Sequence, residues 1–259
     1  MTTPAPKTPL KIRVITPLCE APGDMTAKTL EELAPLQACG LAFDVVTLGA
    51  GPASIENHFD ETLAAPFVVI EAMKAQEQGN DAVIIDCMGD PGLMAAREAV
   101  SIPVVGPGEA AMHMAAMAGH RFSCVSILDS VRPVFYAHAK VYGCIDKLAS
   151  VRTINMPVLE IEENLDRLPE LLFKEALKAV EEDLADTIVL GCTGFLGVAA
   201  QLEHMLRSAG HAVPVINPMP VAALAAAAMV WGGIPHSKRA YPEPNFKKKY
   251  MGFTFPVGG

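Results

Sequence analysis

The segment DAVIIDCMG (residues 81–89) recurs 105 residues later as DTIVLGCTG (residues 186–194). Each copy is a short apolar run that ends in a cysteine and continues into a turn containing glycine. A continuous apolar run of this length, bounded by turn residues, is typical of a strand buried on both faces of a parallel sheet. The recurrence therefore predicts a duplicated chain in which two equivalent strands end at Cys87 and Cys192.

Further β-branched runs lie on both sides of each copy and alternate with stretches rich in Ala, Leu and Glu. The predicted strands are residues 11–16, 42–48, 82–86, 103–106, 121–128, 151–156, 187–191 and 214–217. The predicted helices are residues 25–39, 62–78, 92–100, 169–185, 197–209 and 220–231. This alternation indicates βαβ units and an α/β fold with two pseudo-symmetric lobes, each a short parallel sheet flanked by helices.

The duplication also predicts where the lobes divide. We expect lobe one, carrying Cys87, over residues 10–116 and lobe two, carrying Cys192, over residues 117–235, with tails at 1–9 and 236–259. The last helical stretch could pack back across lobe one.

Composition narrows the function. The 259 residues are 51% hydrophobic, which is enough for a sizeable core, and the net charge of −9 argues against nucleic acid as a partner. No apolar run reaches the roughly 18–20 residues that a membrane span needs. Six cysteines and an N-terminus without an apolar signal segment favour free thiols and a cytoplasmic location. The partner that we expect is a small molecule.

The paired cysteines are the strongest chemical signal. Ligands of parallel α/β sheets bind beyond the carboxyl ends of the strands, where both cysteines fall. A single cysteine there is usually a packing residue, but two at equivalent points of a duplicated unit favour a function. On opposite walls of one cleft, a thiolate can remove a proton from a carbon beside a carbonyl while a thiol on the other face returns one.

Neighbouring residues extend this prediction. We expect Asp90 and Thr193 to cap the helices that follow the two turns, and the dipoles of those helices to favour the thiolate. His113 lies in an apolar helical pattern and is predicted to be a core or lobe-interface residue. The chain has no C-x-x-C or H-E-x-x-H pattern, so no metal ligands are predicted. The glycines of Leu48–Ser54 lack the third glycine of a dinucleotide-binding loop.

Several motifs together resemble the hydantoin/allantoin racemase branch of the aspartate/glutamate racemase superfamily. They are residues 51–56 (GPASIE), 86–93 (DCMGDPGL), 97–98 (RE), 103–106 (PVVG), 109–111 (EAA), 190–194 (LGCTG), 237–238 (SK) and 241–242 (YP). The resemblance implies two Rossmann-like lobes, a homo-oligomer, no metal or cofactor, and a hydantoin-like ring as substrate.

Matching these motifs residue by residue implies the site. Cys87 and Cys192 would be the two catalytic thiols of a cofactor-independent racemase. The substrate-binding residues would be Thr16, Ser54, Met88, Gly89, Ser126, Thr193 and Gly194.

The chain also departs from the pattern of the branch. Thr16-Pro17-Leu18 stands where Asn-Pro-Asn is usual, so a ring-contacting amide is missing, and Met88 stands where Phe is common. No Lys or Arg lies within five residues of either cysteine, which favours a neutral ring over a free amino acid. Two other functions stay open: a decarboxylase or cis–trans isomerase of a small dicarboxylate on the same fold, and a non-catalytic small-molecule binding protein.

Overall fold

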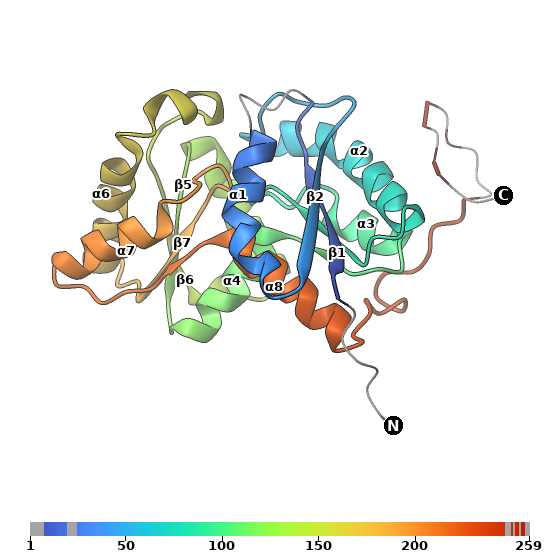
Figure 1. The fold of residues 1–259 in the computed structure, drawn as a ribbon. Helices are drawn as coiled ribbons and strands as arrows, with labels where there is room; N and C mark the ends of the chain where they lie inside the picture. The colour runs from blue at the N-terminus through green and yellow to red at the C-terminus, as the bar shows by residue number, and fades with distance from the viewer. Residues whose placement is uncertain (1–7, 20–24, 247–249, 251, 254, 257–259) are drawn as a thin grey trace.

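Two parallel four-stranded sheets with the same strand order form the centre of the molecule (Figure 1). The computed structural model describes residues 8–19, 25–246, 250, 252–253 and 255–256. The first sheet has the order β2-β1-β3-β4, with β1 Leu10–Thr16, β2 Leu41–Thr47, β3 Ala82–Ile85 and β4 Val104–Val105. The second has the order β6-β5-β7-β8, with β5 Phe122–Ser126, β6 Leu148–Thr153, β7 Thr187–Leu190 and β8 Val215–Ile216. The predicted α/β fold is confirmed.

Helices connect the strands as parallel pairing requires. Those of the first half are α1 Met25–Gln37, α2 His58–Glu77, α3 Leu93–Ala99 and α4 Pro107–Ala118. Those of the second half are α5 Arg132–Val141, α6 Leu168–Glu181, α7 Ala199–Ser208 and α8 Pro218–Trp231. Short 3₁₀ segments at Asp129–Val131, Ile145–Lys147, Val158–Glu160 and Glu162–Asn164 complete the second half. None of the described helices combines the length and the apolar character needed to cross a membrane.

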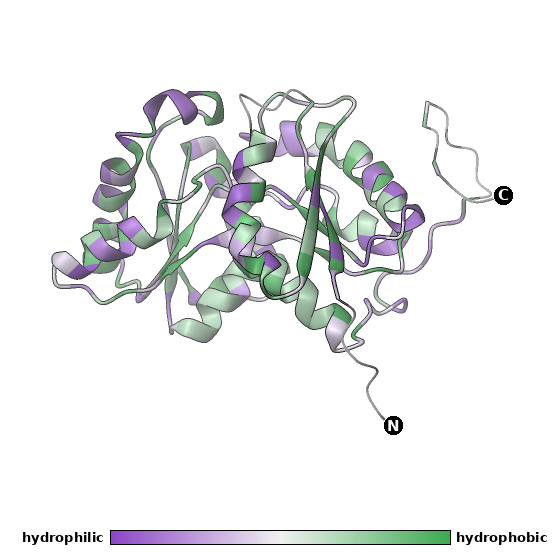
Figure 2. Ribbon diagram, in the orientation of Figure 1, coloured by the Kyte–Doolittle hydropathy of each residue, from purple (hydrophilic) through white to green (hydrophobic). Residues whose placement is uncertain are grey.

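The two strands that carry the repeated motif are central in their sheets. All four residues of β3 and all four of β7 are buried, and each strand pairs with neighbours on both sides. Hydropathy follows the same arrangement, with apolar residues along the strands and polar ones on the outer helix faces (Figure 2). Burial on both faces explains why these runs are continuously apolar instead of alternating.

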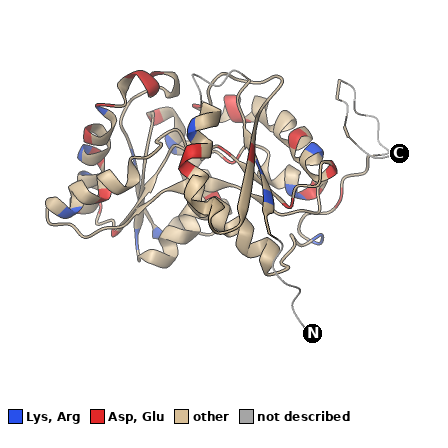
Figure 3. Cartoon of the chain, viewed as in Figure 1, with Lys and Arg blue, Asp and Glu red and all other residues tan. Residues whose placement is uncertain are grey.

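The last helix of each half packs against the other half. Ala111, Met112 and Ala115 of α4 belong to the core cluster of the second sheet, whereas Ala222 and Ala226 of α8 belong to the cluster with β1 of the first sheet. The two helices also pack on each other beneath the sheets (Figure 1). α8 has no charged residue (Figure 3), and its alanines allow close approach. This exchange of helices ties the two sheets together.

Candidate active site

The two cysteines end β3 and β7 in turns of the same construction. The N–H of Gly89 donates a hydrogen bond to Sγ of Cys87 at 3.4 Å, and the N–H of Gly194 donates to Sγ of Cys192 at 3.3 Å. The N–H groups of Asp90 and Phe195 donate to the carbonyls of Cys87 and Cys192 at 3.0 and 3.2 Å. Each turn therefore holds its sulfur by a backbone donor two residues further on.

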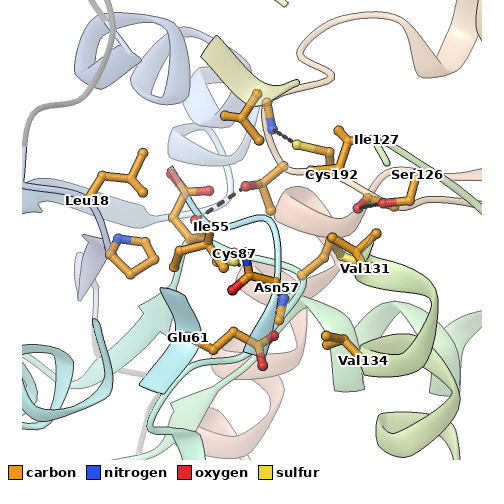
Figure 4. A pocket seen from close by; sticks show the side chains of 18 of the residues that line it. Leu18, Ile55, Asn57, Glu61, Cys87, Ser126, Ile127, Val131, Val134 and Cys192 are labelled. Carbon is orange, nitrogen blue, oxygen red and sulfur yellow. Dashed lines mark hydrogen bonds between the residues drawn. The ribbon is translucent and has the colours of Figure 1, made fainter. Parts of the chain in front are cut away.

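Both cysteines line one cavity between the two sheets (Figure 4). The cavity contains about 610 Å³ of space free of protein atoms, part of it open to solvent. Its other lining residues are Pro17, Leu18, Met25, Ile55, Asn57, Glu61, Asp86, Met88, Gly89, Ser126, Ile127, Val131, Val134, Phe135, Val158, Gly191, Thr193 and Gly194. The lining is mostly apolar, with a few polar groups near the sulfurs, as in small-molecule sites generally.

Five of the seven residues expected to bind substrate line this cavity, namely Met88, Gly89, Ser126, Thr193 and Gly194. Thr16 and Ser54 do not line it. The hydroxyl of Thr16 donates to Oδ2 of Asp86 at 3.2 Å, behind the cavity wall. Ser54 lies in the loop before α2, and the cavity is reached from that loop by Ile55 and Asn57 instead.

Thr16 and Ser126 occupy equivalent places at the ends of β1 and β5. Ser126 Oγ donates to the carbonyl of Gly191 at 2.7 Å, so each hydroxyl supports the residue that precedes a cysteine. That residue is Asp86 in the first half and Gly191 in the second. A second contact crosses between the halves, because Thr193 Oγ1 donates to the backbone carbonyl of Asp86 at 3.3 Å.

The expectation that helix dipoles favour thiolates is wrong. α3 begins at Leu93 and α7 at Ala199, so neither helix starts at its cysteine turn. Burial raises the pKa of Cys87 well above its usual value, and the nearby acidic groups Glu61, Cys192 and Asp90 raise it further. Burial also raises the pKa of Cys192 to about 12, with smaller contributions from the charges of Asp86 and Glu56. Desolvation outweighs the backbone donors, so both thiols are neutral at pH 7.

Asp90 and Thr193 do not cap the helices that follow them. Asp90 has a φ of 44° and accepts hydrogen bonds from the N–H groups of Gly108 and Glu109 at 2.9 and 2.8 Å, which places it at the start of α4. It also accepts from the hydroxyl of Tyr142 at 2.7 Å. The side chain of Thr193 instead bonds Asp86, and α7 begins without a side-chain cap. A cap can serve any helix start within reach, and here tertiary packing brings α4 to Asp90.

His113 is exposed on α4, so of the two expected positions, core or lobe interface, the core position is wrong. Its Nδ1 lies 3.6 Å from Sγ of Cys144, away from the cavity. Among the described residues, no group of three or more His, Cys, Asp or Glu side chains is arranged to hold a metal ion.

A family model described as Asp/Glu/Hydantoin racemase matches residues 12–226. The chain belongs to this family. It is 37% identical to the hydantoin racemase of Paenarthrobacter aurescens over 245 residues, covering 93% of this chain and 100% of that protein. It is 40% identical to the hydantoin racemase of Pseudomonas sp. (strain NS671), covering 78% of this chain and 79% of that one. The structure of allantoin racemase from Klebsiella pneumoniae superimposes with a TM-score of 0.83 at 36% identity, covering 91% of this chain and 94% of that chain.

The predicted resemblance to the hydantoin/allantoin branch is thereby confirmed. In this member of the racemase family, two polar residues of the cavity, Asn57 and Glu61, were not among the predicted site residues. Asn57 caps α2, accepting from the N–H of Asp60 at 3.1 Å, and Glu61 follows in the first turn. The signal was present, because Asn57-x-x-Asp60 is a helix-start pattern, but the predicted helix began four residues too late.

A second unpredicted part of the racemase-family cavity is its apolar wall from α5. Val134 and Phe135 of this helix, with Val131 just before it, line the cavity. Their spacing, together with buried Ala139, matches one face of an amphipathic helix, which is the signal that would have revealed α5.

Two backbone donors remain available in the same cavity. Among the described residues, the N–H groups of Met88 and Thr193 donate no hydrogen bond. Both residues line the cavity, and each directly follows a cysteine.

Proposed function

We propose that this protein is a racemase that inverts the C5 centre of a hydantoin-like ring, a 5-substituted hydantoin or allantoin, by proton transfer between two thiols. The observation that carries the proposal is that Cys87 and Cys192, at the equivalent ends of β3 and β7, line one cavity. A flat five-membered ring held between the two turns would present opposite faces to the two sulfurs.

The proposed reaction has two proton transfers. The thiolate of one cysteine takes the hydrogen from C5, and the electron pair left behind is shared with the adjacent C4 carbonyl as an enolate. The thiol of the other cysteine then gives a proton to C5 from the opposite face. In the reverse direction the two cysteines exchange roles. Each transfer is general acid–base catalysis by side chains, so no step requires a metal or cofactor.

The free N–H groups of Met88 and Thr193 support the enolate. Donors that are already in place stabilise developing negative charge without reorganisation, which is the largest contribution in many sites of this kind. No Lys or Arg is among the described residues that line the cavity. A neutral ring suits these neutral donors better than a substrate carboxylate, which would be left without a counter-ion.

The cavity walls favour a ring with an apolar substituent. Leu18, Ile55 and Val158 line one part of the cavity, and Val134 and Phe135 line another. The amide of Asn57 is available for the polar edge of the ring, where the branch would otherwise place an asparagine from the first strand. Assembly into a homo-oligomer and a cytoplasmic location stay predictions.

The decisive experiment incubates the protein in D₂O with each enantiomer of a 5-substituted hydantoin, with allantoin and with aspartate. Chiral chromatography follows inversion, and mass spectrometry follows deuterium at the stereocentre. We expect the hydantoin or allantoin to racemise with deuterium incorporation and aspartate to remain unchanged.

Two other outcomes would replace the proposal. Release of CO₂ from a small dicarboxylate, or isomerisation of an unsaturated one, would indicate the decarboxylase or cis–trans isomerase that the same fold could support. Binding of the ring without inversion or exchange would indicate a non-catalytic binding protein.

A further inference from the structure

The protonation of the thiols raises a question that the two-thiol reaction does not answer. Both sulfurs are surrounded by apolar and acidic groups, and burial keeps both thiols neutral near pH 7. A neutral thiol cannot remove a proton from carbon, so some group must first accept the proton of the thiol. The following inference rests on the proposed function and concerns which residue that is.

The side chain of Glu61 packs against the turn that follows Cys87. Its side chain is 13% exposed and lines the cavity. Its carboxyl group packs against Gly89: a Cβ added there would overlap Oε1 of Glu61 and lie 3.1 Å from Cδ. Gly89 is also the residue whose N–H bonds Sγ of Cys87. In Figure 4, Glu61 and Asn57 lie on the side of the cavity nearer Cys87, away from Cys192.

The carboxyl group has a route to solvent through its own helix. Oε2 of Glu61 lies 3.2 Å from Nδ1 of His58, and the His58 side chain is 60% exposed. The protonatable groups around Glu61 are therefore Cys87 from the β3–α3 turn and His58 and Asp60 from α2, with His138 of α5 beside His58. Burial raises the pKa of Glu61 to about 7, although His58 opposes the shift.

The described residues of lobe two offer no equivalent of this arrangement. The first turn of α6 places Glu170 in solvent, and the cavity is lined there by Val158 instead. Among the carboxyl groups, Asp86 has the largest electrostatic effect on the pKa of Cys192. Asp86 is 6% exposed and accepts hydrogen bonds from the hydroxyls of Thr16 and Thr29. Asp86 therefore has no exposed protonatable partner comparable to His58 among the groups bonded to it.

We propose that Glu61 accepts the proton of the Cys87 thiol and exchanges it with solvent through His58. The S–H bond of Cys87 breaks, its proton moves to the Glu61 carboxylate, and the resulting thiolate takes the C5 hydrogen, re-forming S–H. After Cys192 has given its proton to the opposite face, Glu61 releases the extra proton to water and Cys192 regains one. The steps involve protons only and balance over a turnover.

The proposal predicts that the two faces differ in solvent exchange. Because Cys87 exchanges through Glu61 and His58, a hydrogen delivered to Cys87 can be replaced by deuterium and returned to the same face. The enantiomer whose C5 hydrogen meets Cys87 should therefore gain deuterium without inversion at early conversion in D₂O. The opposite enantiomer should gain much less.

The test compares Glu61→Gln with Glu77→Gln, the same change at an exposed position of α2. We expect Glu61→Gln to lower kcat about 10²- to 10⁴-fold at pH 7, the usual range for one acid–base group. It should also remove the rise of kcat/KM with pH near 7 and abolish the difference in non-inverting exchange between the enantiomers. Glu77→Gln should retain all three properties, and Glu61→Asp should recover the rise with pH.

Thermal unfolding of each variant separates a folding defect from a lost proton acceptor. If the parent protein does not racemise hydantoins, the proposed function fails before Glu61 is tested. If the parent racemises them and Glu61→Gln keeps both the pH profile and the unequal exchange, Glu61 is not the acceptor. Equal non-inverting exchange from both enantiomers in the parent would overturn the proposal as well.

Discussion

The turn at Cys87 and the turn at Cys192 have the same backbone but different neighbours. In both, a glycine N–H two residues on bonds the sulfur, and the next N–H bonds the cysteine carbonyl. The residue before the cysteine is buried Asp86 in one turn and Gly191 in the other, where a Cβ would approach Cβ of Ser126 to 2.5 Å. The shared backbone conformation provides one thiol for each face of the proposed substrate ring. The neighbouring side chains differ, so the two thiols have chemically different surroundings.

The two sulfurs differ in the acidic groups that lie near them. Glu61 and Asp90 raise the pKa of Cys87, whereas Asp86 and Glu56 raise the pKa of Cys192. Inversion at one carbon requires only that each face carries a thiol able to transfer a proton. The duplicated halves could therefore diverge in every other group near the sulfurs.

Removing either thiol tests what the two turns share and has the largest expected effect. Cys87→Ser and Cys192→Ser should each lower racemisation by about 10²- to 10⁴-fold, because a serine hydroxyl is far less acidic than a thiol. Chiral chromatography measures the loss in both directions. Cys39→Ser, at an exposed cysteine, is the control. If either active-site variant kept the parent rate in both directions, the paired roles would be excluded.

Alanine at the two equivalent glycines tests how the turns differ. In Gly89→Ala the new methyl group would overlap the Glu61 carboxyl, whereas in Gly194→Ala it would lie 3.4 Å from Sγ of Cys192 and 3.7 Å from Ile161. We expect kcat/KM to fall by about 10-fold or more for Gly89→Ala and by less than about 3-fold for Gly194→Ala, since small displacements of reacting groups are costly. Steady-state kinetics measure kcat/KM of both variants. Equal losses of kcat/KM would contradict the inference that a methyl group is more crowded at Gly89 than at Gly194.

The fourth residues of the turns, Asp90 and Phe195, should differ in the pH dependence of stability. Burial raises the pKa of Asp90 to about 7, so the folded protein holds this proton more tightly than the unfolded chain. The contribution of Asp90 to the free energy of unfolding therefore falls as pH rises from about 4 to about 7. Asp90→Asn should lower stability by about 1–3 kcal/mol, with the larger loss at acid pH.

Urea unfolding at pH 5 and pH 8 measures this difference. The matched change Phe195→Leu should lower stability by about 1 kcal/mol at both pH values, because an apolar side chain does not titrate. A pH-independent loss for Asp90→Asn would show that its carboxyl group has its ordinary pKa.

The smallest expected difference concerns the supporting hydroxyls, Thr16 and Ser126. Thr16→Val removes a donor to a buried carboxyl group, whereas Ser126→Ala removes a donor to a backbone carbonyl. Hydrogen bonds to charged groups contribute more, so Thr16→Val should lower stability by about 1 kcal/mol more than Ser126→Ala. Urea unfolding at pH 8 is the measurement. A larger loss of stability for Ser126→Ala than for Thr16→Val would mean that the hydrogen bond from Thr16 does not stabilise Asp86.

Much of the fold could be predicted from local pattern. The eight strands were each located to within a few residues. The clearest were β3 and β7, because a strand that is buried along its whole length is continuously apolar. The start of α2 was placed too late, and that error concealed Asn57 and Glu61. α5 was missed, although Val131, Val134, Phe135 and Ala139 have helical spacing.

The sequence by itself determined the duplicated α/β architecture and the two cysteines at equivalent strand ends, because periodicity and turn residues encode burial locally. Only the tertiary structure decided that α4 packs on the second sheet, that Asp90 caps α4, and that the Glu61 carboxyl group packs against Gly89. It also decided that the thiols are neutral. The physical reason is that desolvation and charge act through space, between segments that the chain separates and folding brings together.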